Sequence, residues 1–234
     1  MPLRAMAAVP LIALSTLVLG ALAILAGFVD GRGGMSRALG RAWARFVLTA
    51  LGVRVEVRGA EHVPSGPAVY AANHGSALDI PILLAHLPAD FRMIHKRSLS
   101  SVPVLGWSLR FAGHIAIDRR HPFRARRSLE TAVRGLREGA SLAVFPEGTR
   151  SQDARVRPFK RGMFGLAIEA GAPVVPVSLD GVKRVVPRGI STLRPGAVRM
   201  TIHPPIETKA KGAGGAAALA EEVRRIVASG CQEE

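Results

Sequence analysis

The sequence is poor in cysteine, in aromatic residues and in acidic side chains, and each scarcity narrows the range of functions. The only cysteine is Cys231, three residues from the end of a 234-residue chain, so neither a disulfide framework nor a thiolate zinc site can form. Aromatic residues make up 5%, which leaves few rings for stacking nucleic-acid bases. Asp and Glu number 17 against 32 Lys and Arg, a formal charge of +15. This excess favours an anionic partner such as nucleic acid, an anionic membrane surface or phosphorylated metabolites.

Motifs for common cofactors and nucleophiles are also missing. The seven histidines are scattered, and none lies at a metal-ligand spacing with carboxylates or cysteines. The sequence has no G-x-S-x-G elbow of a serine hydrolase and no Gly-rich phosphate loop of a nucleotide enzyme. We therefore expect no metal and no organic cofactor.

A long segment near the N-terminus has no charged residue. It runs from Ala5 to Val29, and as a helix it would be about 38 Å long, enough to cross a hydrocarbon core of about 30 Å. A cleaved signal peptide is the alternative, since Ala21–Ala23 is an acceptable cleavage site. Arginines follow at positions 32, 37, 41 and 45, and positive flanks stay cytoplasmic. We expect a retained anchor, either spanning the bilayer or inserted into it from one side, with the remaining chain on the cytoplasmic face of the cell membrane.

The next segment, from Met35 to Gly52, has the pattern of a basic amphipathic helix. Apolar residues recur at helical spacing with arginines on the other side, namely Leu39, Trp43, Phe46, Val47 and Leu51 against Arg37, Arg41 and Arg45. Such a helix could lie at the membrane interface with its arginines at lipid phosphates. An ordinary surface helix packed on the domain is an equally good interpretation.

From Val53 onward the pattern alternates between strands and helices. Short apolar or alternating runs predict strands at 53–59, 67–73, 91–95, 114–118, 141–145, 173–179 and 197–203. The clearest helix is Pro122–Glu138, which Gly139 ends. Such alternation predicts an α/β fold, with one domain built on a mixed, mainly parallel sheet flanked by helices and preceded by the membrane-anchoring helix. We divide the chain into 1–52 (anchor and basic helix), 53–208 (the α/β domain) and 209–234 (a flexible link and a last helix).

The first candidate site follows the strand at 67–73. Asn73 and His74 come directly after it, and Asp79 stands five positions beyond the histidine. In such sheets, reactive groups gather just past the carboxyl ends of the strands. If His74 lies in the loop and Asp79 in the first turn of the following helix, the carboxylate can orient the imidazole, whose other nitrogen can then remove a proton from an alcohol. A satisfied polar corner of the core is the alternative.

Two further strand ends carry polar residues. The strand at 141–145 runs into Pro146, Glu147, Gly148, Thr149 and Arg150, a tight turn whose arginine could bind phosphate with two parallel hydrogen bonds. The strand at 114–118 ends in Asp118, and Arg119 follows it. Around it lies a basic tract, which comprises Arg92, Lys96, Arg97, Arg110, Arg119, Arg120, Arg124, Arg126 and Arg127 and is opposed only by Asp118. We expect most of these side chains to face solvent or membrane, and one or two to belong to the site.

Four blocks in this order resemble those of the glycerophospholipid acyltransferases, and especially the 1-acylglycerol-3-phosphate acyltransferases. They are Asn73-His74-x4-Asp79, Gly113-x3-Ile117-Asp118-Arg119, Phe145-Pro146-Glu147-Gly148-Thr149-Arg150 and Val175-Pro176-Val177. The similarity extends over about residues 53 to 206. In the second block, Ala116 stands where the family usually has Phe, which leaves a gap near the acceptor or the acyl chain.

The resemblance implies a membrane-bound O-acyltransferase of phospholipid biosynthesis. His74 would be the general base that takes a proton from the free hydroxyl of 1-acyl-glycerol-3-phosphate, and Asp79 would hold its ring. The alkoxide would attack an acyl-CoA or acyl carrier protein thioester directly, giving phosphatidic acid without an acyl-enzyme. Substrate-binding roles would fall to the acceptor ligands Arg119 and Arg150, to the turn residues Glu147, Gly148 and Thr149, and to Lys96, which could stabilise the oxyanion.

Two other functions are compatible with the sequence. The same chemistry could act on another lyso-lipid, such as a lyso-ornithine lipid or a lysocardiolipin-type acceptor. A non-catalytic, membrane-tethered basic protein that binds nucleic acid is a distant second, because aromatic residues are few and the basic tract lies beside the anchor. The partners that we expect are therefore a lysophospholipid, an acyl thioester and membrane lipids, and no nucleic acid.

Overall fold

A single seven-stranded sheet organises the chain. The computed structural model describes residues 3–118, 121–151, 155–187 and 192–231. The strands are β1 (Val53–Arg58), β2 (Val69–Ala72), β3 (Phe91–Lys96), β4 (Ile115–Ile117), β5 (Ser141–Val144), β6 (Val174–Asp180) and β7 (Gly196–Ile202). Their order across the sheet is β1-β7-β6-β2-β5-β3-β4, and every neighbouring pair is parallel except β6 and β7. The predicted mixed, mainly parallel sheet is therefore confirmed.

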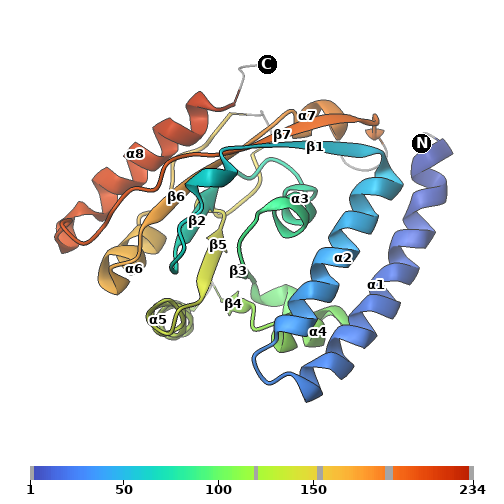
Figure 1. Ribbon diagram of the computed structural model, residues 1–234, viewed down its shortest axis with the longest axis horizontal. Coiled ribbons are helices and arrows are strands. Elements are labelled where there is room, and N and C mark those ends of the chain that lie inside the picture. Colours follow the sequence, from blue (N-terminus) through green and yellow to red (C-terminus); the bar gives the residue numbers. More distant parts are fainter. Residues whose placement is uncertain (1–2, 119–120, 152–154, 188–191, 232–234) are drawn as a thin grey trace.

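Helices cover both faces of this sheet (Figure 1). One face carries α2 (Gly34–Leu51), α3 (Asp79–His86) and α4 (Leu105–Phe111), with α1 (Leu3–Val29) outside α2. The other carries α5 (Pro122–Arg137), α6 (Gly162–Ala170) and α8 (Ala216–Ser229), and the short α7 (Val182–Val185) follows β6. Alternate residues of one strand serve opposite faces, as in β2, where Tyr70 and Ala72 enter one apolar cluster and Val69 and Ala71 the other. Two cores therefore sandwich the sheet.

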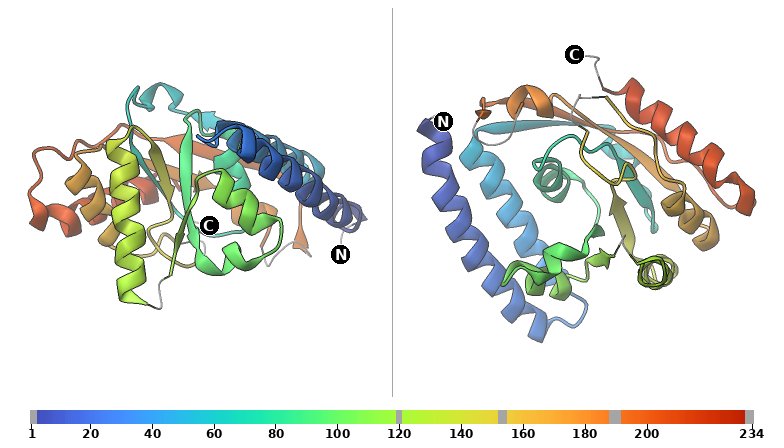
Figure 2. Two further views of the ribbon diagram at one scale, coloured as in Figure 1. Left: turned by 90° about the horizontal axis from the view of Figure 1, so that it is seen from below. Right: turned by 180° about the vertical axis from the view of Figure 1, so that it is seen from behind.

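The first two helices form an antiparallel hairpin that packs along its whole length (Figure 2). The Ser36 hydroxyl donates to the Ala23 carbonyl at 2.7 Å, and the Trp43 indole N–H donates to the Thr16 hydroxyl at 3.0 Å. The side of α1 that faces away from the domain is exposed and apolar, with Met6, Val9, Leu11, Leu14, Leu17, Val18, Leu22, Leu25, Phe28 and Val29. By length and composition, Met6–Val29 could cross a membrane.

Two arginines of α2, Arg37 and Arg41, make contacts with the domain. Arg37 makes two hydrogen bonds with Asp90, at 2.7 and 2.8 Å. Arg41 donates to the backbone carbonyls of Leu87 and Ala89 at the end of α3, and its guanidinium lies over the Phe91 ring. These two side chains tie the hairpin to the domain, which favours the interpretation of α2 as a helix packed on the domain and leaves Arg45 as its exposed arginine.

The C-terminal segment folds back onto the second core. The buried Thr208 hydroxyl is bound to the carbonyls of Ala167 and Ala172 at the end of α6, and Lys211 pairs with Glu222 of α8 at 3.2 Å. Leu219, buried on α8, joins the core on that face of the sheet. The last helix is therefore packed on the domain.

The topology brings the sequence motifs to one edge. Strands β6, β2, β5, β3 and β4 are parallel neighbours, so their carboxyl ends all lie at the same side of the sheet. The residues that follow β2, β5 and β3 are His74, the turn from Phe145 to Arg150, and the segment after Lys96. We call this side the carboxyl edge.

Candidate active site at the carboxyl edge

Asn73 fixes the start of the loop that carries His74. Its side-chain amide donates to the Leu179 carbonyl at 2.9 Å and accepts from the Leu179 N–H at 2.8 Å. The amide thus continues the β2–β6 pairing one step beyond the last paired backbone residue, and it satisfies two buried groups that would otherwise be costly. This bond fixes the position from which His74 leaves the strand.

The imidazole of His74 is oriented by Asp79. Its Nδ1 lies 2.8 Å from Asp79 Oδ2, and the same oxygen accepts the backbone N–H groups of Gly75 and Ser76 at 2.8 Å. The carboxylate is buried, with 1% of its side chain exposed, whereas 14% of the His74 side chain is exposed. Because the carboxylate accepts, Nδ1 carries the proton, and Nε2 is left with a free lone pair.

Asp79 lies in the first turn of the following helix, as the sequence predicted. Asp79 is the first residue of α3, and Ser76 lies before it without acting as its N-cap. The Ser76 hydroxyl instead accepts the Leu78 N–H at 3.3 Å. The geometry that brings a loop histidine to a carboxylate five positions later is the one the sequence suggested, with the loop folding back over the helix start.

The turn after β5 supports His74 from a second strand. Glu147 Oε1 accepts the His74 backbone N–H, and the Ser151 N–H donates to the His74 carbonyl, both at 2.8 Å. The Phe145 ring stacks on the imidazole with centroids 4.1 Å apart. Gly148 has a φ of 81°, which a residue with a Cβ rarely adopts. The turn therefore holds the backbone and one ring face of the histidine.

Glu147 is buried beneath this loop, with 5% of its surface exposed. Burial raises the pKa of its carboxyl group, and hydrogen bonds from the backbone of His74 and Arg157 oppose that shift. The sequence interpretation gave Glu147 to the substrate-binding turn. Its side chain points into the protein rather than toward solvent, so it acts on the histidine loop.

The other sequence-predicted residues surround the edge. Thr149 and Arg150 are exposed at the end of the turn, and Lys96 is exposed at the end of β3. Asp118, which follows β4, lies 4.0 Å from the Arg97 guanidinium. Arg119 lies outside the described residues. The structure thus joins His74 directly to Asp79 and Glu147, places Gly148 in the supporting turn, and leaves Thr149, Arg150 and Lys96 exposed.

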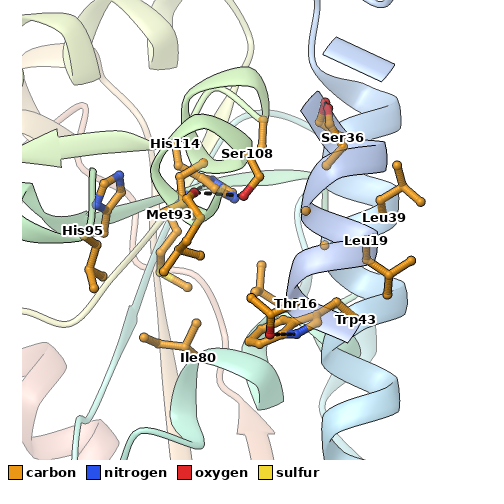
Figure 3. Close-up of a pocket in the computed structure, with 18 residues that line it drawn as sticks. Thr16, Leu19, Ser36, Leu39, Trp43, Ile80, Met93, His95, Ser108 and His114 are labelled. Atoms are coloured by element: carbon orange, nitrogen blue, oxygen red, sulfur yellow. Dashed lines mark hydrogen bonds between the residues drawn. The ribbon is translucent and has the colours of Figure 1, made fainter. Parts of the chain in front are cut away.

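An apolar cavity of about 250 Å³ lies between the α1–α2 hairpin, α4 and the sheet. It reaches Ile80, the residue after Asp79, and extends along β3 past Met93. Figure 3 shows Thr16 and Trp43 of the hairpin facing Ile80 and Met93 across it. The hydroxyls in its wall are bound within the protein, so the space is suited to a hydrocarbon chain.

Two histidines line the cavity without a carboxylate partner. The Met93 N–H donates to His114 Nδ1 at 2.9 Å, and burial lowers the pKa of His114 to about 3. Burial also lowers the pKa of His95, whose Nδ1 lies 3.1 Å from the Lys96 carbonyl. Both rings stay neutral near pH 7, which keeps charge out of the cavity.

The described residues offer no group of side chains that could bind a metal ion. Among residues 3–118, 121–151, 155–187 and 192–231, no group of three or more His, Cys, Asp or Glu side chains is arranged to hold an ion. The carboxylate nearest the site, Asp79, already accepts three donors.

The sequence did not indicate the contacts of Asn73, Phe145 and Glu147 that fix the position of His74. Asn73 and Phe145 belong to the sequence motifs, but the sequence assigns them no role, and it does not indicate the inward direction of Glu147. The buried strand and the proline before Glu147 place it at a strand end, but they do not set the direction of its side chain. The cavity had no local signal, since its walls come from four separate segments.

Comparison with known proteins agrees with this geometry. The acyltransferase family model matches residues 54–180, which contain the whole carboxyl edge from Asn73 to Leu179. The chain therefore belongs to the acyltransferase family.

Within that family, the chain is similar to enzymes that acylate lysophosphatidic acid. It is 34% identical to human 1-acyl-sn-glycerol-3-phosphate acyltransferase alpha over 210 residues, which cover 89% of this chain and 74% of the relative. It is 39% identical over 156 residues to a chloroplastic 1-acyl-sn-glycerol-3-phosphate acyltransferase of Brassica napus, covering 65% of this chain but less than half (45%) of that protein. The crystal structure of the 1-acyl-sn-glycerophosphate acyltransferase PlsC from Thermotoga maritima matches with a TM-score of 0.82 and 29% identity, covering 97% of this chain and 93% of that one.

Proposed function

We propose that the protein transfers a fatty acyl group from an acyl thioester to the free hydroxyl of 1-acyl-glycerol-3-phosphate, which gives phosphatidic acid. The observation that carries this proposal is the His74–Asp79 pair, with Nδ1 and Oδ2 2.8 Å apart at the carboxyl edge. The names of the similar enzymes support the acceptor. The donor is an acyl-CoA or an acylated carrier protein, both of which are acidic and suit a basic protein.

The chemistry needs one base and no covalent intermediate. His74 Nε2 takes the proton of the lipid hydroxyl as its oxygen attacks the thioester carbonyl. The C–S bond then breaks, the thiolate leaves, and the imidazolium returns the proton to it. Asp79 keeps the proton on Nδ1 throughout, so Nε2 is available as an acceptor at the start of each cycle. General-base help of this kind supplies roughly 10²–10⁴-fold in rate.

The exposed cations at the same edge would bind the negative charges of the substrates. Arg150 would hold the acceptor phosphate, because a guanidinium matches phosphate oxygens with two parallel hydrogen bonds. Arg119, which lies outside the described residues, would share this role by its place in the second sequence motif. Thr149 would add a hydroxyl contact, and Gly148 gives the turn its shape. Lys96 would stabilise the negative charge that develops on the thioester oxygen. Glu147 would act through the His74 backbone rather than by touching a substrate.

The donor's acyl chain would occupy the cavity beneath the hairpin. The cavity begins beside Ile80, next to the catalytic pair, and its volume is about 250 Å³. Each methylene group buried there contributes about 0.8 kcal/mol of binding free energy. Two cavity walls, α1 and α2, belong to the membrane-facing hairpin, which gives a chain dissolved in the bilayer a short route to the site.

We further propose that the hairpin anchors the protein to the cytoplasmic face of the cell membrane. The exposed apolar side of α1 would be immersed in the bilayer, and the basic C-terminal flank, with Arg32 and Arg45 exposed, favours the cytoplasmic side. Because α1 packs against α2 along its length, insertion from one side fits the packing better than a span by α1 alone. The full-length protein should stay in the membrane pellet after a high-salt wash, and release by salt alone would contradict the anchor.

The function is tested by a turnover assay on the purified full-length protein in lipid vesicles. The acceptors are lysophosphatidic acid, other lysophospholipids and a lyso-ornithine lipid, each with acyl-CoA and with acylated carrier protein. We expect turnover of lysophosphatidic acid with at least one donor. Acylation of another lyso-lipid with lysophosphatidic acid untouched would reassign the acceptor, and no transfer to any acceptor would refute the proposed activity.

A further inference from the structure

A second basic site lies at the amino ends of strands β3 and β5, at the opposite end of these strands from the carboxyl edge that carries His74. A pocket of about 550 Å³ is formed by the α1–α2 turn, the start of β3, the end of α4 and the α5–β5 loop. Four arginines line it, namely Arg37, which Asp90 binds, and Arg32, Arg92 and Arg110 from three of these segments. We call it the arginine pocket. The loop before β5 and the first residues of β3 mark the amino ends of those strands, so strand β5 separates the pocket from the carboxyl edge.

The three arginines have no partner for their charges. None of their guanidinium groups makes an ion pair or hydrogen bond with a residue that the structure describes. The neighbouring Arg37 is different, because Asp90 holds it with bonds of 2.7 and 2.8 Å. Glu138 is the one acidic group in the described lining that is not so engaged, so the pocket keeps an excess of two positive charges.

Arg92 is positioned rather than loosely extended. A Cβ atom at Gly113 would lie 3.4 Å from its Nε, and one at Gly135 would lie 3.3 Å from its Nη1. The side chain therefore lies across two glycines, one from the α4–β4 turn and one from α5, which leave room for it. It is half-buried, and a partly desolvated guanidinium without an anion is costly unless a ligand supplies the negative charge.

The surroundings of the pocket are apolar and exposed. Phe111 lines it and packs against Phe28 at the end of α1, with ring centroids 4.9 Å apart. Phe28 and Val29 are 75% and 82% exposed. Figure 1 shows the α1–α2 turn beside α4 at the end of the hairpin. In the membrane anchor proposed above, this end of α1 would lie at the membrane–water boundary, which is where lipid phosphates are.

We propose that the arginine pocket binds the phosphate group of an anionic membrane lipid, at a site separate from the acceptor site. Arg92 and Arg110 would bind phosphate oxygens, and Arg32 would close the pocket from the hairpin turn. The lipid's chains would lie against Phe28 and Val29 in the bilayer. A free phosphate ion would bind the same arginines, but it would make no contact with the apolar residues Phe28 and Val29. The bound lipid would hold the hairpin end at a fixed depth.

The test measures lipid binding by calorimetry on the full-length protein in a non-ionic detergent. The probes are dihexanoyl phosphatidylglycerol and inorganic phosphate. The variants are Arg110→Gln and Arg92→Gln, with Arg225→Gln on the exposed side of α8 as the control that removes the same charge. Arg110 is exposed, so its variant keeps the test valid if Arg92→Gln does not fold. Arg150→Ala is added to remove any contribution of the acceptor site.

We expect both pocket variants to weaken phosphatidylglycerol binding at least tenfold, and Arg225→Gln and Arg150→Ala to change it less than twofold. Inorganic phosphate should bind at least tenfold more weakly than the lipid. Unchanged lipid affinity in Arg110→Gln and in folded Arg92→Gln would overturn the site. Phosphate binding as tight as the lipid, and lost in Arg110→Gln, would make it a site for free phosphate and overturn the lipid assignment. These outcomes do not depend on whether the protein transfers acyl groups.

Discussion

His74 and His114 lie in two regions of the same sheet and differ in what surrounds the ring. At the carboxyl edge, Asp79 binds His74 Nδ1 at 2.8 Å and Phe145 covers one ring face. In the wall of the cavity, a backbone N–H binds His114 Nδ1 at 2.9 Å, and burial lowers the pKa of that ring to about 3. The first ring has a proton fixed on Nδ1, and the second has its proton on Nε2.

The groups around an imidazole determine whether it can accept a proton. A carboxylate stabilises the imidazolium that forms when the ring accepts a proton, so the ring can work as a base at neutral pH. A desolvated ring without a carboxylate resists protonation and behaves as a neutral part of the cavity wall. The following predictions challenge this contrast, beginning with the largest effect.

His74→Ala should lower kcat by about 10³-fold, within the range of roughly 10²–10⁴ that general-base help supplies. The fold should survive, because the backbone bonds of residue 74 to Glu147 and Ser151 do not need the ring. The control is His62→Ala, whose ring contacts the Ile202 carbonyl away from the site, and which should keep its rate within about threefold. A residual rate above about a tenth in His74→Ala, with the fold intact by circular dichroism, would remove the base from the mechanism.

Asp79→Asn should lower kcat by about 10²-fold, because an amide no longer stabilises the imidazolium and can favour the wrong tautomer. An amide oxygen can still accept the N–H groups of Gly75 and Ser76, so the loop should keep its shape. Steady-state rates across pH, with Glu56→Gln on the exposed side of β1 as the control, measure the effect. If the two variants have equal rates, Asp79 does not assist the histidine.

Arg150→Ala should raise the KM for the phosphorylated acceptor about tenfold and change kcat little. The exposed guanidinium would contribute ground-state binding to the phosphate rather than to the reacting bond. The KM for the acyl donor should move less, and Arg225→Ala provides a variant of equal charge change on α8. An acceptor KM like that of the wild type would exclude Arg150 from the acceptor site.

Gly40→Leu should shift the enzyme toward shorter acyl chains by a few-fold. Gly40 lines the cavity from α2, and a Cβ there would meet no heavy atom within 4 Å, so a leucine fills the space without strain on the helix. The ratio of kcat/KM for sixteen-carbon and ten-carbon donors reports the shift. Ala42→Leu, on the exposed side of the same helix, should leave the ratio unchanged, and an unchanged ratio in Gly40→Leu as well would mean that the chain lies elsewhere.

His114→Gln should reduce the loss of folding stability that the wild-type protein shows at mildly acid pH. The folded pKa of about 3 is below the unfolded value of about 6.5, so below pH 6.5 the unfolded chain binds a proton that the folded one does not. Wild-type stability therefore falls as pH decreases from 6.5, by about 1 kcal/mol at pH 5.5 from this ring. A Tm that falls with pH equally in both proteins would contradict the burial of His114.

Most of the fold could be predicted from the sequence, because its signals are local. All seven strands lie within one or two residues of the predicted runs, and Pro122–Glu138 corresponds to α5. Each strand is a short apolar or alternating run bounded by turn residues, which is the pattern that burial on a sheet requires. The order β1-β7-β6-β2-β5-β3-β4 depends on contacts distant in sequence, and local patterns could not give it.

The site could be predicted only in part. The His74–Asp79 pairing follows from a short loop before a helix, and the sequence indicated it. The direction of Glu147 could not be read, since a glutamate in a turn is normally solvated and its inward bond to the His74 backbone forms only when β2 and β5 pair. The ties of Arg37 to Asp90 and of Arg41 to the carbonyls after α3 were missed for the same reason, because those partners lie about fifty residues further along the chain.

A single-turnover experiment tests the central claim most directly. Protein in excess over radiolabelled acyl donor is mixed with lysophosphatidic acid and quenched at intervals, and a second sample omits the acceptor. Direct transfer by the His74 base predicts that labelled phosphatidic acid forms in one phase and that no label is bound covalently to the protein in either sample. Label on the protein before product forms, or without the acceptor, would contradict direct transfer to the lipid hydroxyl.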